Sequence, residues 1–155
     1  MTNIQAKKTG SQKARNSAAR LLAVQTVYQM HKNDQQAEAA IKEYLEHRFG
    51  TDADGDEMVT PDQDHYALVV RGVEENMAQL NEMVALHRGK EPNMPQEPLL
   101  HTIFLCGAFE LMALQAIDFA VIISDYLHVT RAFYDDSEVK LVNALLDSLR
   151  KTTRD

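Results

Sequence analysis

Basic side chains without any acidic neighbour mark the first 33 residues of this 155-residue chain. They are Lys7, Lys8, Lys13, Arg15, Arg20 and Lys32. The other 122 residues carry ten basic and 23 acidic side chains, and the whole chain has a net charge of −7. A cationic segment on an acidic body can contact a phosphate backbone over a limited area, because the body repels nucleic acid elsewhere. The same pattern also fits a solvated tail or a transit peptide, and these alternatives stay open at this point.

An acidic stretch containing Asp52, Asp54 and Asp56 is similar to the start of a calcium-binding loop. Such loops need glycine at the sixth position for the turn and a bidentate glutamate at the twelfth. Counted from Asp52, these positions hold Glu57 and Gln63. We therefore interpret the stretch as a solvated acidic loop rather than a metal site.

Side chains that could bind zinc or act as nucleophiles lack partners at the required spacing. The six histidines form no HExxH pair, and Cys106 is a single cysteine within an apolar run, as a packed thiol would be. No P-loop, GxGxxG or GxSxG motif occurs. Glu110 and Asp125 stand in apolar segments, where we expect hydrogen-bonded buried acids. The sequence predicts a protein that is not an enzyme and uses no metal or cofactor.

Helices must position these side chains, because the chain has only six Gly and four Pro and is rich in helix-forming residues. Apolar residues recur at helical spacing in segments 17–32, 35–48, 60–87, 99–114 and 119–133, and a last helix starts at 135–137. Asn16 or Ser17 is the expected cap of the first helix. Thr60, followed by Pro61 and a glutamine, is the expected cap of the third, which we expect to break near residues 75–76.

The helices are expected to form a single all-α domain. Residues 1–16 are predicted to be a flexible basic arm, and residues 17–150 the domain itself. The proline-rich segment 89–98 is a linker that separates an N-terminal helical subdomain, 17–88, from a C-terminal one, 99–150. No apolar leader and no run of 18 uncharged apolar residues occurs, so a cytoplasmic protein without membrane contact is expected.

Three stretches of the chain together resemble the NusB family, in the family's order. Residues 17–30 read SAARLLAVQTVYQM, residues 98–113 read PLLHTIFLCGAFELMA, and residues 121–150 read VIISDYLHVTRAFYDDSEVKLVNALLDSLR. The family signatures are an AVQALYQ-like first helix after a basic arm, a GAxEL-like core helix, and a VNGVLD-like last helix after a phenylalanine-bearing turn. The resemblance implies a bacterial protein with a bundle of about seven helices in two helical subdomains.

The resemblance also implies a function in transcription antitermination and transcription regulation. Family members bind the boxA element, a single-stranded RNA, together with the ribosomal protein NusE, in a complex with RNA polymerase that supports ribosomal RNA transcription. Matched by position, the RNA-binding residues would be Lys13, Arg15, Arg20, Gln25, Tyr28, Phe133, Ser137, Lys140 and Asn143. Cations would contact phosphates and flat rings would stack on unpaired bases.

The sequence departs from the family pattern at several positions. His101 and Leu105 stand where the family has basic residues on the core helix, and Ala144 replaces a glycine. Judged by spacing alone, Tyr28 and Phe133 also fit as core aromatics. The alternative function is therefore a divergent NusB-like protein-interaction adaptor that has lost boxA RNA binding. A third possible function is that of the RNA-binding module of an RNA methyltransferase. A homodimer is a possible oligomeric state.

Overall fold

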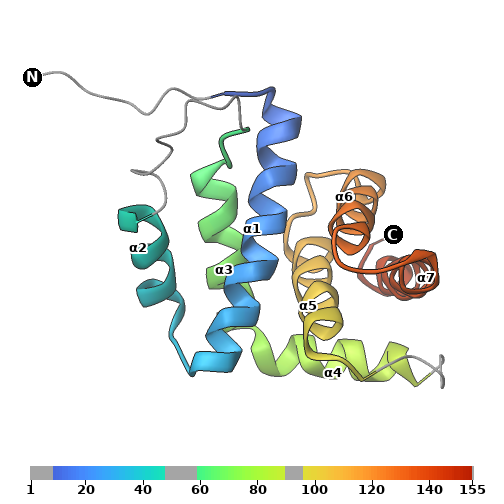
Figure 1. The fold of residues 1–155 in the computed structure, drawn as a ribbon. Coiled ribbons are helices and arrows are strands. Elements are labelled where there is room, and N and C mark those ends of the chain that lie inside the picture. Colours follow the sequence, from blue (N-terminus) through green and yellow to red (C-terminus); the bar gives the residue numbers. More distant parts are fainter. Residues whose placement is uncertain (1–8, 48–58, 90–95, 155) are drawn as a thin grey trace, which may run out of the picture.

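The computed structural model describes residues 9–47, 59–89 and 96–154. In this part of the chain all regular structure is helical, as Figure 1 shows. The helices are α1 (Gln12–Asn33), α2 (Ala37–His47), α3 (Gln63–Glu75), α4 (Met77–Arg88), α5 (Pro98–Ala113), α6 (Phe119–Arg131) and α7 (Asp136–Thr153). The predicted all-α bundle of about seven helices, including the break near residues 75–76, is confirmed. The acidic stretch at 51–58 lies outside the described residues.

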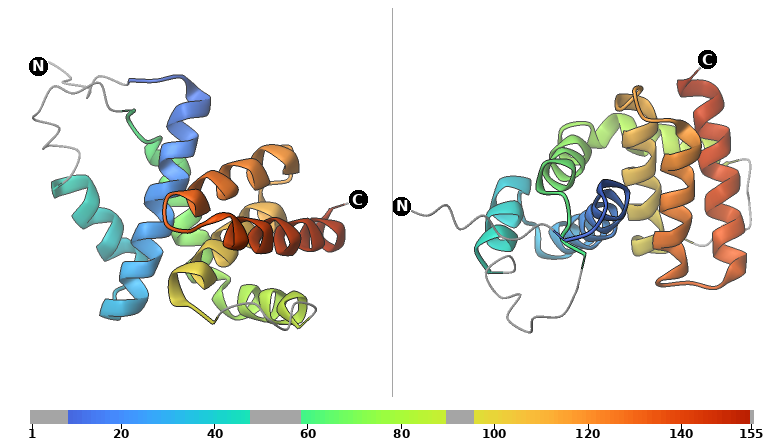
Figure 2. Two further views of the ribbon diagram at one scale, coloured as in Figure 1. Left: turned by 45° about the vertical axis from the view of Figure 1, so that its right-hand side comes forward. Right: turned by 90° about the horizontal axis from the view of Figure 1, so that it is seen from above.

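Helix α5 occupies the centre of the bundle, because its side chains are apolar on nearly every face. It packs against α1 and α3 on one side and against α6 and α7 on the other. Seen from above, α5, α6 and α7 form a row, and α1 lies beside α5 (Figure 2). Cys106 is buried in α5 as predicted, and burial raises the pKa of its thiol.

Helix α4 crosses the lower end of the bundle (Figure 1) and packs against α5 and α7. Its buried residues Leu80, Val84 and His87 lie on one face, and the His87 Nδ1 is 2.6 Å from the Ser148 hydroxyl of α7. Predicted as part of the N-terminal subdomain, α4 instead has most of its contacts with the C-terminal helices. The chain turns at Asn76, whose side chain donates to the Gly72 carbonyl and ends α3.

Two glycines allow α5 to approach its neighbours closely. A Cβ at Gly72 of α3 would lie 2.0 Å from the ring of Phe109, and one at Gly107 of α5 would lie 2.9 Å from Leu146 of α7. At Gly72 this distance leaves no room for a methyl group unless the Phe109 ring moves, and at Gly107 the end of the Leu146 side chain would have to shift. The glycine of the GAxEL-like motif therefore serves helix packing.

Both predicted capping sites were misplaced by a few residues. Helix α1 begins at Gln12, with the Ser11 hydroxyl accepting from the Ala14 amide, so residues 12–16 belong to the helix and not to a flexible arm. Helix α3 begins at Gln63, where Asp62 accepts from the His65 amide. Thr60 instead pairs with Thr9 through backbone and side-chain hydrogen bonds of 2.8 to 3.1 Å. This pairing ties the start of α1 to the start of α3.

The described ranges contain no helix long and apolar enough to cross a membrane. In the same ranges, His, Cys, Asp and Glu side chains nowhere gather in the groups of three or more that could hold a metal ion.

Candidate RNA-binding surface

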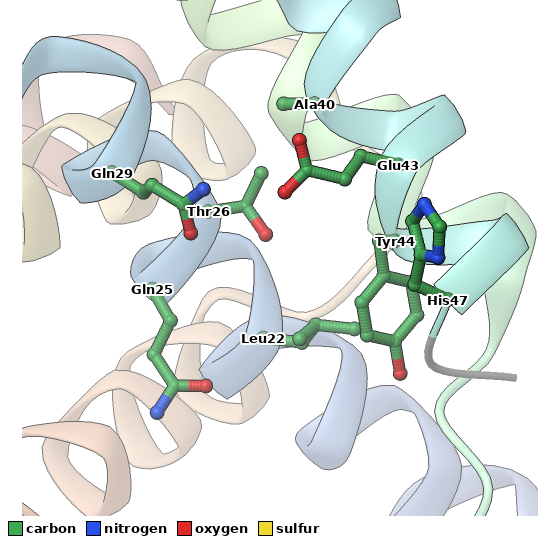
Figure 3. A pocket seen from close by; sticks show the side chains of 8 residues that line it. All are labelled: Leu22, Gln25, Thr26, Gln29, Ala40, Glu43, Tyr44 and His47. Atoms are coloured by element: carbon green, nitrogen blue, oxygen red, sulfur yellow. The ribbon is translucent and has the colours of Figure 1, made fainter. Parts of the chain in front are cut away.

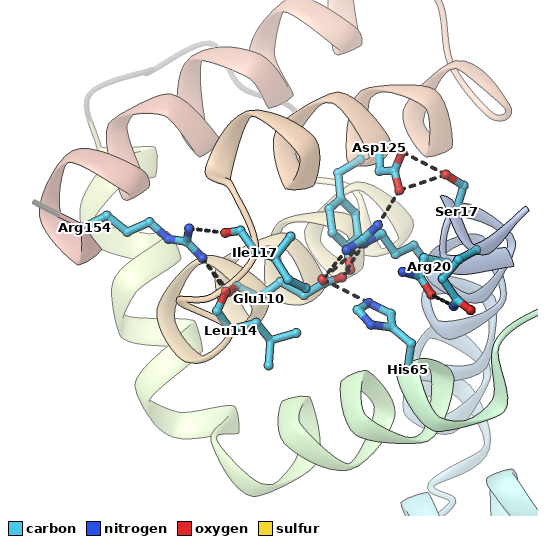
Figure 4. A network of polar contacts seen from close by, with 11 residues as sticks. Ser17, Arg20, His65, Glu110, Leu114, Ile117, Asp125 and Arg154 are labelled. Atoms are coloured by element: carbon cyan, nitrogen blue, oxygen red, sulfur yellow. Dashed lines mark hydrogen bonds and ion pairs between the residues drawn. The ribbon is translucent and has the colours of Figure 1, made fainter. Parts of the chain in front are cut away.

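A buried network of charged side chains links α1 to α3, α5 and α6 (Figure 4). The Arg20 guanidinium donates through Nε and Nη2 to the two carboxylate oxygens of Glu110, each at 2.9 Å, and through Nη1 to Asp125. The Ser17 hydroxyl lies 2.9 Å from both carboxylate oxygens of Asp125. His65 and the Tyr126 hydroxyl bind the same Glu110 carboxylate. Glu110 and Asp125 are thus the hydrogen-bonded buried acids that the sequence predicted.

The network keeps a carboxylate charged inside the protein. Burial would raise the pKa of Glu110, but hydrogen bonds from His65 and Arg20 and the charge of Arg20 lower it below its ordinary value. The Tyr126 pKa is raised, first by burial and then by the negative charge of Glu110. Tyr126 therefore stays a hydrogen-bond donor to Glu110 at neutral pH.

Two arginines that the resemblance placed on RNA are turned inward. Arg20 is 1% exposed, and Glu110 and Asp125 occupy its guanidinium. Arg15 is 8% exposed, its Nε donates to the Thr60 carbonyl at 3.1 Å, and its Nη1 lies 4.0 Å from Asp62. Neither presents a free cation to solvent, so both are better described as structural residues.

A stripe along α1 remains on the surface. Leu21, Gln25, Tyr28 and Lys32 follow one another at spacings of four, three and four residues, which places them on one face of the helix. The Lys32 ammonium lies 5.2 Å from the centroid of the half-buried Tyr28 ring. This cation–π pair combines a flat surface with a positive charge. Lys13 is also exposed, on the first turn of the same helix.

The residues predicted around the α6–α7 turn are exposed as well. Phe133 is 39% exposed, although an aromatic ring of this size is usually covered. Ser137, Lys140 and Asn143 follow on the outer side of α7, and the Ser137 hydroxyl is 2.9 Å from Glu138. Arg131, at the last turn of α6, is an exposed cation that sequence reasoning did not select. Its position two residues before Phe133 in the sequence could have identified it as a candidate RNA-binding residue.

A second set of basic groups meets where α1 and α4 end and α5 begins. The pKa of His101 is lowered by burial and then by the positive charges of Arg88 and His31. The Arg88 guanidinium lies 5.7 Å from the Phe104 ring centroid, and His101 Nε2 is 2.8 Å from the Asn81 side-chain oxygen. Sequence reasoning missed this cluster, because its members come from three helices.

His101 and Leu105, which stand where the family has basic residues, differ in their exposure to solvent. The Leu105 side chain is fully buried in the hydrophobic core, whereas His101, one turn earlier, is half-buried. An arginine at position 105 would have no route to solvent. The two positions do not form one exposed face.

The predicted residues thus fall into two surface groups, one on α1 and one at the α6–α7 turn. Helix α1 packs against α6, through the Ser17–Asp125 and Arg20–Asp125 contacts. The right view of Figure 2 shows the α6–α7 turn at one end of these two helices. The buried network therefore fixes the relative position of the two groups.

Comparisons with known proteins agree with this architecture. The transcription antitermination protein NusB of Bartonella henselae is 32% identical over 155 residues, which cover 99% of this chain and 98% of that protein. The protein of the same name from Rhizobium etli is 34% identical over 148 residues, covering 95% and 91% of the two chains. The solved structure of T. maritima NusB superposes with a TM-score of 0.70 at 19% identity, over 93% of this chain and 92% of that one, and shares the fold. A model of the NusB family matches residues 17–151, and the chain belongs to the NusB family.

Proposed function

We propose that this protein binds single-stranded RNA of the boxA type through α1 and the α6–α7 turn. The observation that carries the proposal is the surface cation–π pair of Tyr28 with Lys32. It is joined by the exposed ring of Phe133, which follows the exposed Arg131 by two residues in the chain. Unpaired bases stack on such rings, while cations contact the phosphates. Lys140 and Asn143 extend the same surface along α7.

The RNA contact is small and confined to this surface. Residues 34–155 are acidic overall, so nucleic acid is repelled from most of the body. About three or four exposed cations serve the contact, which corresponds to a slope of log affinity against log salt near −2 to −3 for a single strand. So few phosphate contacts give a modest affinity for RNA, which fits a protein that binds RNA jointly with a second protein. The proposed partner is the ribosomal protein NusE, in a cytoplasmic antitermination complex with RNA polymerase.

The alternative is an adaptor that binds proteins and no longer binds boxA RNA. It is favoured by the burial of Arg15 and Arg20, which removes two basic groups from the surface that the resemblance had assigned to RNA. Position 105, where the family has a basic residue, holds a buried leucine. A homodimer remains a further arrangement for such an adaptor.

RNA titrations separate these two functions. Fluorescently labelled boxA-like and scrambled RNAs are titrated with the protein, with and without NusE, at several salt concentrations. Preferential binding of the boxA-like RNA that weakens when Phe133→Ala and Lys140→Gln are introduced supports the proposal. Binding of NusE with no preference between the two RNAs would support the adaptor instead. Val121→Ala, an exposed apolar substitution on α6 outside the proposed surface, serves as the matched control.

A further inference from the structure

A groove of about 620 Å³ runs between α1 and α2, beside the RNA-binding stripe of α1. It is lined by Leu22, Gln25, Thr26, Gln29, Ala40, Glu43, Tyr44 and His47 (Figure 3). Its floor is polar, because the Thr26 hydroxyl is 2.9 Å from the buried Tyr66 hydroxyl. Tyr44 forms one wall, with its ring centroid 5.1 Å from that of Tyr66. The resemblance assigned a role to Gln25 alone among these lining residues.

The groove is suited to a cation. Glu43 is the one acidic side chain in the lining, which contains no lysine or arginine. Figure 3 shows its carboxylate pointing across the groove toward Thr26 and Gln29. Within the described residues the carboxylate has no basic partner and accepts one long hydrogen bond, 3.3 Å from the Gln35 amide. The Gln25 and Gln29 side-chain carbonyls can add two further acceptors.

The surroundings of the groove reinforce this preference. Helix α2 carries Glu38, Glu43 and Glu46 against a single lysine, Lys42. Glu38 and Glu46 already have ion-pair partners, in Arg71 at 2.7 Å and Lys42 at 4.0 Å, whereas Glu43 faces the groove. A phosphate would meet a carboxylate at this place, so the groove does not extend the RNA-binding surface.

We infer that this groove binds an arginine side chain from a basic segment of a partner protein. The planar guanidinium matches a carboxylate in a fork and stacks on an aromatic ring, so Glu43 and Tyr44 together favour arginine over lysine. The carboxamides of Gln25 and Gln29 accept the remaining N–H groups. Gln25 is shared with the surface stripe of α1, whereas Gln29, Glu43 and Tyr44 belong to the groove alone. The inference therefore rests on these three residues and not on the proposed RNA contact.

The test uses acetylated, amidated tetra-arginine as the probe, with tetra-lysine as its comparator. Chemical shifts of the backbone and glutamine side-chain amides of the full-length protein are followed by NMR during titration. We expect the shifts to concentrate at Gln25, Gln29 and Tyr44, with tetra-arginine binding more tightly than tetra-lysine. Glu43→Gln should weaken tetra-arginine binding about tenfold, as expected for loss of a close charge pair.

Glu46→Gln is the matched control, since it removes the same charge from the same helix outside the groove. It should leave tetra-arginine binding nearly unchanged. An equal loss in Glu46→Gln and Glu43→Gln, or equal binding of the two peptides, would overturn the assignment. Groove shifts with single-stranded RNA that strengthen in Glu43→Gln would also overturn it, because the occupant would then be a nucleobase. Far-ultraviolet circular dichroism confirms that each variant is folded, and RNA binding measured in parallel reports separately on the proposed function.

Discussion

Arg20 of α1 and Glu110 of α5 form two parallel hydrogen bonds, from Nε to Oε2 and from Nη2 to Oε1, each 2.9 Å long and shielded from solvent. The same guanidinium reaches Asp125 of α6. One side chain of the first helix therefore fixes two helices of the C-terminal half. Because the charges are buried, their loss is not compensated by water.

Replacing Glu110 tests the structural role of this pair. Glu110→Gln leaves the Arg20 charge buried with Asp125 as its single acidic partner, and removal of one partner of a buried pair costs about 3–5 kcal/mol. Urea unfolding followed by circular dichroism measures the loss. Glu38→Gln is the control, because its partnership with Arg71 is exposed and should change stability far less. Equal losses in the two variants would contradict the role assigned to burial.

Acid should destabilise the protein through the same carboxylate. The folded-state pKa of Glu110 lies below its ordinary value of 4.5, so folding favours the charged form. The contribution of Glu110 to the free energy of unfolding is fully present above pH 4.5. It is lost as the pH falls toward the folded-state pKa, because the unfolded chain binds more protons in this range. The urea concentration at the unfolding midpoint, measured between neutral pH and pH 3, should decrease as the pH is lowered. The fall should be shallower in Glu110→Gln, and an identical slope in both proteins would refute the assignment.

Arginine substitutions on α5 should have opposite effects at two positions one turn apart. Leu105→Arg buries an unpaired charge in the core and should cost more than about 3 kcal/mol. His101→Arg lies at a half-buried site near the surface and should leave the fold intact. If the His31–Arg88–His101 cluster contacts RNA, the added charge should tighten binding and steepen the salt slope by about 0.7. Thermal melts and RNA titrations at varied salt measure both; a stable Leu105→Arg protein would contradict the observed packing.

A methyl group at Gly72 should disrupt the contact between α3 and α5. Alanine is the better helix former by about 1 kcal/mol, but its Cβ would lie 2.0 Å from Phe109 and displace the ring. Gly72→Ala should therefore be net destabilising, by about 1–3 kcal/mol. Gly89→Ala is the control, because its Cβ would meet carbonyl oxygens at ordinary contact distances of 3.5 and 3.7 Å. Urea unfolding of both variants makes the comparison, and a stabilised Gly72→Ala protein would refute it.

The amino-acid sequence by itself determined the helices and most of their limits. Apolar residues at helical spacing, the prolines before α5 and the all-round apolar character of residues 99–114 are local signals that need no knowledge of partners. The burial of Glu110 and Asp125 could also be predicted, since both acids stand within apolar segments. Sequence resemblance added the family.

Only the tertiary structure decided the roles of Arg15, Arg20 and Ser17. Ser17 was an expected helix cap, but the Ser11 hydroxyl caps α1, and Ser17 lies inside the helix with its hydroxyl bound to Asp125, 108 residues away. Arg20 looked like an RNA ligand because its acidic partners, 90 and 105 residues along the chain, belong to helices whose packing no local pattern records. A basic residue is exposed or buried according to the partners that the fold brings to it, and those partners are set by long-range packing rather than by sequence neighbours.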